Sequence, residues 1–559
     1  MDNQLIKLYK NIIRVISFFI LAVFVWLSLV STSTVTLMEE VYFTGIGGGW
    51  CLGIFVACLA VTFVPFVNGC ISSLDGRLKD NDNLFKLSYA CLIILLFLLP
   101  VLWVLSTGFN SWADSAHVQE AAFGLINGDY SEFMPGGYIE KWPNQIGLVL
   151  AEAVICRLFG ENSGLVFQLI NAMCIPIISV SLAVFTDSRF HQLCVLVLSV
   201  FCFPLLFSTS HIYGNIPGLA LSLLAFALLF ELVEKKCIVK GLFSALLIAM
   251  ACLVKQNYII FLIAYCIIGI VMALKNKKAS IAIMAIVAVA LSFLISASAA
   301  GVVRNITGCK LDGGVSKLSY IAMAMQDGDR APGWFNEYNN MTYVQAGYDT
   351  ELQGKVSREE ITLKLRNFID HPVYAATFYM KKLASQWNEP MFQSIWILRG
   401  HERELSGFIE YISSIYGSYK ILPYFKFFQV AIYMAAFIFI CTEKKPEEKQ
   451  LLLLMTFIGG VLFHIMWEAK AQYALFYFVL LIPVGVKGCS VFRKCMLALA
   501  GRIGKKDKED TKKSQGVFGT LVCVLFIAVF LAALYYLRIP DALRSDTLLY
   551  YQYIVDNNI

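Results

Sequence analysis

The chain has 559 residues, of which 58% are hydrophobic and only 15% are charged, and its formal net charge at pH 7 is +6. Soluble globular proteins have about a quarter of charged residues, so this composition excludes an ordinary soluble domain. Apolar runs long enough to cross a bilayer core of about 30 Å as helices recur along the sequence, for example at 87–106 and 281–303. The sequence therefore predicts an all-α polytopic membrane protein, with the lipid bilayer as its first partner.

The 16 cysteines and the excess of basic residues do not change this interpretation. Most cysteines lie inside apolar runs, with no CxxC pair and no His/Cys cluster of zinc spacing, and buried cysteines are usually small apolar fillers. A DGD sequence at 327–329 resembles a metal-binding motif but is more typical of a turn in a polar loop. The basic residues collect in short loops, as orientation signals do. We therefore expect no metal, no cofactor and no nucleic-acid partner.

The basic loops assign a side of the membrane to each segment, because lysine and arginine collect in short cytoplasmic loops. A first span is predicted at about 12–33, and because it lacks a small-residue cleavage site it is interpreted as a retained span. The basic residues before it, which place the N-terminus inside, are Lys7, Lys10 and Arg14. A second span at about 41–66 returns to a basic loop, and a third at 87–106 exits outward. The segment 107–162 is then extracytoplasmic.

Three longer apolar regions are predicted to fold as pairs of short spans. As one helix, 241–274 would be about 50 Å long at 1.5 Å per residue and would put its two flanking basic clusters on opposite sides. A turn at 254–257 keeps both clusters inside and keeps Lys255 from the membrane centre, where a charge costs roughly 2.5–3.5 kcal/mol. The same reasoning breaks 192–232 at 208–215 and 450–486 at 467–472, and all three turns are predicted to lie outside.

These segments give one membrane domain of about thirteen transmembrane helices with two extracytoplasmic elaborations. The predicted parts are an N-terminal transmembrane hairpin at 1–86, a transmembrane core at 87–303 containing the first outer loop at 107–162, an extracytoplasmic loop subdomain at 304–420, transmembrane hairpins at 421–500, a cytoplasmic linker at 501–515, and a last transmembrane helix with an outer tail at 516–559. We expect a multi-pass protein of the plasma membrane with a cytoplasmic N-terminus.

Both elaborations contain predicted helices. The segment 114–127 has its apolar residues on one helical face, and 145–160 is interpreted as an interfacial helix. In the larger elaboration a single helix is expected at about 357–386, ending at the sequence QWNEP.

Every predicted outer connection carries unusual polar residues, whereas the inner loops are merely basic. The residues that carry this pattern are Asp114, His117, Glu120, His211, Tyr213, Lys255, Gln256, Asn257, Trp467, Glu468, Lys470, Gln472 and Tyr473. A carboxylate that faces cations can take a proton from an acceptor hydroxyl while the cations stabilise an anionic leaving group. This asymmetry indicates a functional site on the extracytoplasmic face.

Each of these residues also has an ordinary structural interpretation. Asp114 precedes a predicted helix, and aspartate is a favoured N-cap. His211 is typical of a turn, and Lys255 could extend toward the lipid headgroups. Glu468 and Lys470 could pair with each other. The residues alone leave these alternatives open.

Several stretches resemble the GT-C superfamily of integral-membrane glycosyltransferases, especially bacterial relatives of protein O-mannosyltransferases and aminoarabinose transferases. The sequence WADSAHVQEAAFGLINGDY, followed by GGYIEKWPNQIG, is similar to the family's first outer loop. The stretch 253–264 resembles its short paired spans, 371–390 a helix of its large outer loop, and 467–475 a late motif usually written with Glu and then Arg-Tyr. The similarity runs over about 85–535, and it depends on the order of the motifs rather than on one of them.

The resemblance implies a GT-C-like fold and transfer of a sugar from a polyprenyl-phosphate lipid donor to an extracytoplasmic cell-envelope acceptor, with inversion. The acceptor could be a glycan, a teichoic acid or a protein. Asp114 matches the acidic residue that is the family's catalytic base, and Lys255 and Lys470 are then expected to hold the departing phosphate. The expected substrate-binding residues are Lys255, Glu468, Lys470, Tyr473, His211, Gln256, Arg304 and Arg330.

Two features depart from the family pattern. Gln472 stands where the family often has an arginine before Tyr473, which is why the cations expected at the phosphate include Arg304 and Arg330. In addition, two spans precede the family's usual first landmarks.

Two other classes of protein remain as hypotheses. In a polysaccharide-lipid transporter or polymerase-like protein, the outer polar turns would line a substrate path. Transporters usually show internal repeats and charges near the midplane, whereas the charges here gather at one face and no clear repeat is found. A noncatalytic scaffold for envelope assembly is the third hypothesis, and it would tolerate loss of Asp114, Lys255 and Glu468 together.

Overall fold

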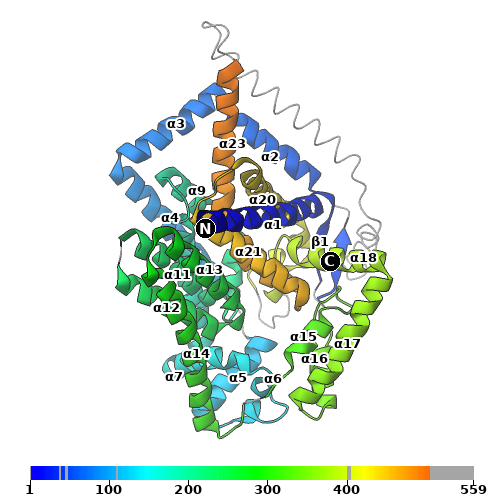
Figure 1. Ribbon diagram of the computed structural model, residues 1–559. Coiled ribbons are helices and arrows are strands. Elements are labelled where there is room, and N and C mark those ends of the chain that lie inside the picture. Colours follow the sequence, from blue (N-terminus) through cyan, green and yellow to red (C-terminus); the bar gives the residue numbers. More distant parts are fainter. Residues whose placement is uncertain are drawn as a thin grey trace.

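A computed structural model describes residues 2–36, 39–44, 48–108, 111–235, 237–311, 313–398 and 405–503. Nearly all of this part of the chain is helical (Figure 1). The predicted last helix and tail at 516–559, and the linker at 501–515 beyond residue 503, lie outside the described residues.

The helices that form the body of the molecule are mostly long and apolar. They are α1 (Asp2–Val30), α2 (Gly49–Val61), α3 (Pro65–Asp80), α4 (Asp82–Thr107), α8 (Ser163–Ala183), α9 (Arg189–Val200), α10 (Phe203–Phe207), α11 (Asn215–Lys235), α12 (Ile238–Val254), α13 (Ile259–Asn276), α14 (Ala279–Thr307), α20 (Ile415–Thr442), α21 (Glu448–Met466), α22 (Ala471–Phe478) and α23 (Leu481–Ile503).

Shorter elements form the two predicted loop elaborations. The first contains α5 (Asp114–Asn127), η1 (Ser131–Phe133), α6 (Tyr138–Lys141), η2 (Pro143–Gln145), α7 (Ile146–Phe159) and η3 (Gly160–Asn162). The second contains α15 (Lys317–Met323), α16 (Tyr338–Gln345), α17 (Thr350–Asp370), α18 (Pro372–Trp387), η6 (Trp396–Leu398) and α19 (Gly407–Ser413). The two remaining single turns are η4 (Ser208–Ser210) and η5 (Gln256–Tyr258).

Within the described residues, eight helical stretches are long and apolar enough to cross a membrane, or up to 11 if each of three bent helix pairs is one span. The bent pairs join α2 to α3 at 74°, α9 to the 203–210 segment at 58°, and α22 to α23 at 48°. Several long helices also expose large apolar side chains, such as Phe19 on α1 and Phe293 on α14, which is the surface that lipid requires. The protein is therefore a polytopic helical membrane protein; the predicted total of about thirteen also counted a helix in 516–559.

All three predicted breaks in the long apolar regions are present. One falls between α12 and α13, one between α10 and α11, and one between α21 and α22. The expected helices at 114–127 and 145–160 also appear, as α5 and α7.

The predicted start of the second span, at about residue 41, is wrong, because the helical part of this region begins with α2, which forms with α3 one of the bent pairs that could be a span. Residues 41–44 form strand β2 (Val41–Thr44), which pairs antiparallel with β1 (Thr32–Val35) in the register Thr32↔Thr44 and Val35↔Val41. These strands are rich in β-branched residues, which favour extended backbone. The hairpin is held on α18 because Ser33 donates from its amide to Asn388 O at 3.2 Å and from its Oγ to Ala384 O at 2.7 Å.

The single helix expected at 357–386 is also wrong, because the chain forms α17 and α18 with a break at His371. Pro372 follows this residue, and a proline disfavours the helical conformation of the residue before it. His371 accordingly has φ −126° and ψ 68°. Pro372 then occupies the first turn of α18, where a proline is tolerated.

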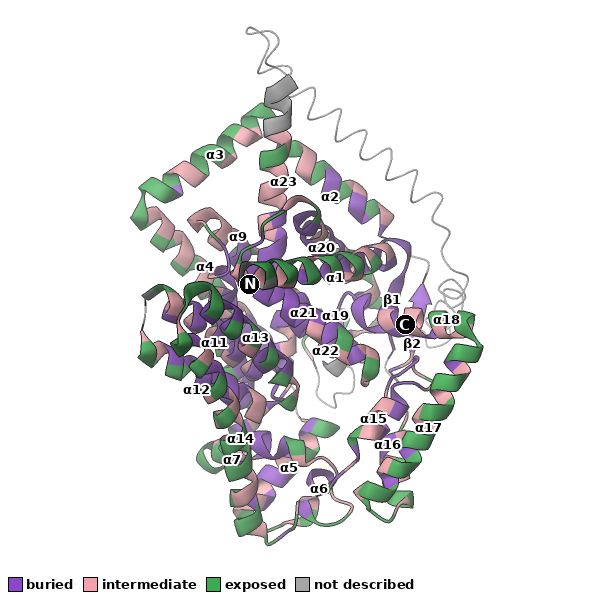
Figure 2. Cartoon of the chain, viewed as in Figure 1, coloured by how far each residue is buried: buried purple, intermediate pink, exposed green. Residues whose placement is uncertain are grey.

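The main core lies where α20, α21, α22 and α23 pack together, and Figure 2 shows α21 and α22 largely buried while α3 and α17 are largely exposed. One buried polar group joins three elements inside this core. Lys426 on α20 donates to Ser31 O at 2.8 Å and to Asn388 Oδ1 at 2.7 Å, and Asn388 Nδ2 donates to Ser31 O at 3.0 Å. The end of α1, the end of α18 and the middle of α20 are therefore fixed to one another.

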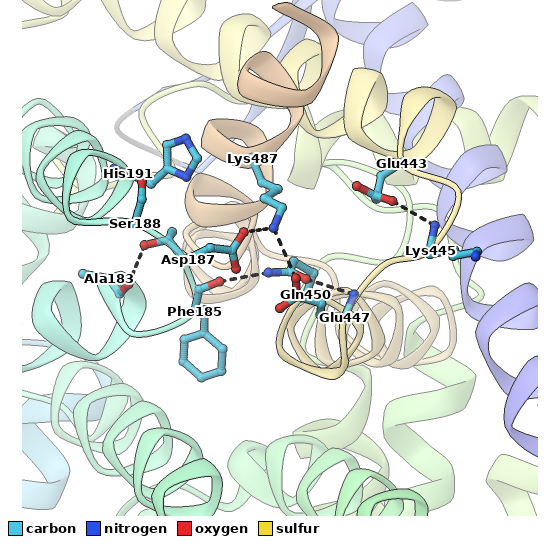
Figure 3. A network of polar contacts seen from close by, with 11 residues as sticks. Ala183, Phe185, Asp187, Ser188, His191, Glu443, Lys445, Glu447, Gln450 and Lys487 are labelled. Carbon is cyan, nitrogen blue, oxygen red and sulfur yellow. Dashed lines mark hydrogen bonds and ion pairs between the residues drawn. The ribbon is translucent and has the colours of Figure 1, made fainter. Parts of the chain in front are cut away.

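Polar contacts tie together the loops at one end of the long helices (Figure 3). Lys487 on α23 forms ion pairs with Asp187 and Glu447, and Gln450 donates to Phe185 O at 3.1 Å. Nearby, Glu448 accepts ion pairs at 3.0 Å from Lys10 on α1 and from Lys275 on α13. The segments gathered here carry basic residues, such as Lys10 and Lys275, of the kind from which the sequence analysis predicted the cytoplasmic side.

Candidate functional site

Asp114 begins α5 and is not the cap of that helix. The N-cap residue is Ala113, and the α5 terminus has no side-chain capping hydrogen bond. Within the described part of the chain, the exposed Asp114 carboxylate has no hydrogen-bond or ion-pair partner. The capping interpretation of Asp114 is therefore wrong, and the carboxylate is available to a ligand.

The backbone just before Asp114 is strained. Ala113 has φ 51° and ψ −134°, a region that residues with a Cβ rarely adopt, at a cost of about 1–3 kcal/mol. Such strain persists only where surrounding contacts enforce it and is frequent at functional sites. Here the strain stands directly before the candidate base, at a helix start that has no side-chain cap.

Lys255 lies between α12 and α13 and is buried, with 7% of its surface exposed. Its Nζ is 3.8 Å from the centre of the Tyr213 ring, which is a cation–π contact. Burial lowers the pKa of Lys255 to about 8, although the nearby carboxylates of Asp114 and Glu468 act in the opposite direction. Lys255 therefore does not extend toward lipid headgroups; it belongs to one electrostatic group with Asp114 and Glu468.

Lys470 forms an ion pair that the sequence did not indicate. Its Nζ is 2.7 Å from Oε1 of Glu39, whose Oε2 is 2.6 Å from Nη1 of Arg330. Burial lowers the pKa of Lys470, but the charges of Glu39 and Glu468 more than offset this, so the pKa is raised and the ammonium persists. The ion-pair partner of Lys470 is thus Glu39 and not Glu468.

Glu39 sits in the connection between β1 and β2, with φ 60° and only 5% of its surface exposed. Its amide donates to Thr36 O at 3.1 Å, and the Val41 amide donates to Arg330 O at 3.0 Å. The hairpin at the start of the predicted second span therefore delivers a buried carboxylate between two cations. The sequence analysis placed Glu39 in the short connection between its first two predicted spans and did not single it out.

Glu468 lies between α21 and α22, beside Lys470. Burial raises the pKa of Glu468 to about 7; Lys470 opposes this effect and Asp114 adds to it. Its main-chain oxygen lies 3.1 Å from Nδ1 of His464, and the next residue, Ala469, donates its amide to Gly333 O at 2.8 Å. The segment that carries Glu468 and Lys470 is therefore fixed through its backbone.

Lys382 of α18 is a second residue that the sequence analysis missed. Its buried ammonium donates to Ala324 O at 2.7 Å and to Ile465 O and Trp467 O at 3.0 Å each. Burial lowers the pKa of Lys382 to about 7. A Cβ on Gly333 would lie 2.7 Å from Lys382 Cε, so only glycine leaves room for this side chain. Lys382 thus holds the end of α21 against the loop subdomain. Its contact with Trp467 O lies one residue before Glu468.

Aromatic residues surround these charges. The hydroxyl of Tyr213 accepts a hydrogen bond from Nε2 of Gln145, and burial holds the pKa values of Tyr138 and Tyr213 well above the usual range. His211 stacks on Tyr213 with ring centres 5.3 Å apart, and burial followed by Lys255 and Lys470 lowers the pKa of His211 to about 3. His211 is therefore neutral. Tyr473, in the first turn of α22, stacks on His464 at 5.5 Å.

The two remaining residues that were expected at the site, Gln256 and Arg304, are both exposed. Gln256 follows Lys255 directly but is exposed in η5, and Arg304 is exposed in the last turn of α14. Among the described residues, no ion pair within 4 Å links Arg304 to Asp114, Glu39 or Glu468. The DGD segment behaves as an ordinary loop, because Asp327 accepts a hydrogen bond from the Tyr374 hydroxyl.

The site draws two lysines, one arginine and three acids from five distant stretches of one polytopic helical membrane protein, and the carboxylate of Asp114 has no partner among the described residues. No protein-family model and no curated protein matches this chain. The argument for its function therefore starts from the site itself.

Proposed function

We propose that this chain is a membrane glycosyltransferase of the GT-C kind, which transfers a sugar from a polyprenyl-phosphate donor to a cell-envelope acceptor. The observation that carries the proposal is the unpartnered carboxylate of Asp114, close enough to Lys255 and Lys470 for its charge to act on both. A proton acceptor beside buried cations is what an acceptor hydroxyl and an anionic leaving group require. The order of sequence motifs that resemble the GT-C superfamily supports the same class.

In the proposed reaction, Asp114 accepts the proton of the acceptor hydroxyl. The hydroxyl oxygen attacks the anomeric carbon on the face opposite the phosphate, so that the new glycosidic bond has the inverted configuration. The bond between that carbon and the phosphate oxygen breaks, and its electron pair leaves with the polyprenyl phosphate. Lys255, Lys470 and Arg330 stabilise the charge that builds up on this phosphate.

Glu39 gives this cation group a particular geometry. Its two oxygens each take one cation, Lys470 or Arg330, at 2.6–2.7 Å. A phosphodiester also offers two non-bridging oxygens, and arginine and lysine both bind phosphate. In our proposal the donor phosphate therefore competes with Glu39 for Lys470 and Arg330, while Glu39 neutralises these partly buried cations when no donor is bound.

The location of the site is part of the proposal. The loops that carry Asp114, Lys255 and Lys470 are those that the basic-loop rule assigns to the extracytoplasmic side. The opposite group of loops contains Lys10, Lys275 and Lys487, which suits a cytoplasmic face. A plasma-membrane protein with a cytoplasmic N-terminus and an outward-facing site follows from this orientation.

The test is transfer by the purified full-length protein in liposomes, with a panel of labelled polyprenyl-phosphate sugars and extracted cell-envelope acceptors. We expect one donor to give a labelled product of inverted anomeric configuration, as read by NMR. A folded protein that transfers sugar from none of the donors, but moves a labelled lipid across the bilayer, would favour the transporter hypothesis and contradict ours.

A further inference from the structure

A second cluster of potential ligands lies beside Tyr138. It consists of His117 and Glu120 on α5 and Glu132 in η1. One ligand atom from each of the three residues lies within 4.8 Å of the others. We propose that this triad binds a zinc-like divalent transition-metal ion, which revises the expectation of no metal drawn from the sequence.

The distances within the triad fit a tetrahedral ion. Nδ1 of His117 is 3.3 Å from Oε1 of Glu132 and 3.5 Å from Oε2 of Glu120. In a tetrahedral zinc site with metal–ligand bonds of about 2.0–2.2 Å, neighbouring ligand atoms are about 3.3–3.6 Å apart. The third pair, between the two glutamates, can close by rotation of the Glu120 side chain, which is 64% exposed.

Local structure holds two of the ligands in place. The His117 ring stacks on the Tyr138 ring with centres 5.0 Å apart and planes at 13°, and the Tyr138 amide donates to Oε2 of Glu132 at 2.8 Å. Tyr138 thus orients the imidazole and leaves the other Glu132 oxygen to face it. Such support of ligands by neighbouring groups is typical of metal sites.

The turn after α5 explains how Glu132 reaches the helix. Gly128 ends α5 with φ 85°, and Asp129 accepts a hydrogen bond from the Ser131 amide at 3.0 Å. The chain then runs so close to α5 that a Cβ on Gly124 would clash with Asp129 O. His117 and Glu120 are one turn apart on the same face of α5, and this turn places Glu132 beside them.

The donor set decides the class of ion. One imidazole nitrogen and two carboxylates suit zinc and its first-row neighbours, whereas magnesium and calcium prefer oxygen ligands alone. Three protein ligands also leave a fourth position open to water. Because Tyr138, on which His117 stacks, is close enough to Asp114 for the charge of that carboxylate to act on it, a bound ion would fix the first loop beside the candidate site.

The inference does not depend on glycosyl transfer and is tested by metal binding to the full-length protein in detergent. The protein is first stripped of metal with a chelator. When Zn²⁺ is then added, we expect one ion per chain by elemental analysis. Co²⁺ added in its place should give the visible absorption of a tetrahedral site. Binding should weaken at least about tenfold in Glu132→Gln and His117→Lys, since both remove a ligand. Glu161→Gln, an exposed acid elsewhere in the same loop, is the matched control.

The triad could serve either as a metal site or merely as a group of ion pairs between His117 and the two glutamates. His117→Lys separates these alternatives, because lysine keeps an ion pair with the glutamates but lowers zinc affinity. If the wild-type protein binds no Zn²⁺, binds Mg²⁺ in its place, or binds Zn²⁺ equally well in both variants, the proposal is overturned. A rise in the melting temperature on adding Zn²⁺ to the wild type, absent in Glu132→Gln, supports it and also reports on variants that are less stable.

Discussion

The carboxylate of Glu39 lies 2.7 Å from the ammonium of Lys470, although the two residues are near opposite ends of the described chain. A β-hairpin brings Glu39 to this position, and Arg330 binds the other oxygen of the same carboxylate. Buried charges are costly unless they are paired, so Glu39 neutralises cations that we assign to a lipid phosphate.

Replacing Glu39 with glutamine should strengthen the binding of polyprenyl phosphate. The side chain keeps its shape, but Lys470 and Arg330 lose the anion that competes with the donor. We expect affinity to rise at least fivefold, or about 1 kcal/mol, and the ligand-free variant to melt at a lower temperature than the wild type. Thermal unfolding with and without polyprenyl phosphate measures both effects.

Glu40→Gln is the control for that experiment, because it removes the same charge from the next residue, whose carboxylate accepts a hydrogen bond from the Tyr42 hydroxyl at 3.2 Å. It should leave affinity unchanged. Weaker binding of polyprenyl phosphate by Glu39→Gln than by the wild type would mean that Glu39 orients the cations and does not compete with phosphate.

The rate should fall in alkaline solution as Lys255 loses its proton. Burial lowers the pKa of Lys255 to about 8, so the ammonium predominates below pH 8 and its fraction falls about tenfold per unit well above it. A profile of kcat/KM against pH reports groups of the free enzyme and should bend downward near pH 8. In Lys255→Arg this limb should move to higher pH, because a guanidinium keeps its charge; an unmoved limb would assign it to another group.

Lys382→Met should destabilise the protein and impair transfer. Methionine fills similar space but leaves three buried carbonyls, at Ala324, Ile465 and Trp467, without their donor. The loss is expected to be on the order of 3 kcal/mol. Lys381→Met is the matched change on the same helix, at a partly exposed residue, and should cost little. Comparable melting temperatures for the two variants would refute the role given to Lys382.

The strain at Ala113 predicts an unusual benefit from glycine. Ala113→Gly should raise stability by about 1 kcal/mol, because glycine adopts the conformation at φ 51° without a clash. Ala116→Gly, three residues later inside α5, should lower stability by about the same amount. Unfolding in detergent compares the pair, and a loss of stability in both variants would show that the Ala113 backbone is not strained.

Helices and breaks set by local sequence could be predicted well. The apolar face of 114–127 predicted α5, and the limit that a bilayer places on helix length predicted the turn at Lys255. The expected convergence of Asp114, Lys255, Glu468 and Lys470 also depended on local signals, because each polar residue stood out in an apolar surrounding.

Contacts between distant segments could not be predicted in this way. The strand at 41–44 is apolar enough to be mistaken for part of a span, and only its partner, β1, distinguishes the two. Glu39 and Lys382 acquire their roles from Lys470, Arg330 and the end of α21, none of which is near them in sequence. For the break at His371, by contrast, a local signal existed in Pro372.

The most direct test of the central proposal compares Asp114→Asn with Glu161→Gln in the liposome transfer assay. Both variants remove one carboxylate charge from the same loop, and asparagine leaves the start of α5 unchanged in shape. A general base contributes about 10²–10⁴-fold to a rate, so Asp114→Asn should lose at least a hundredfold while its melting temperature stays that of the wild type. Glu161→Gln should remain fully active. Sugar transfer by Asp114→Asn at the wild-type rate would contradict the assignment of Asp114 as the base on which the proposed function depends.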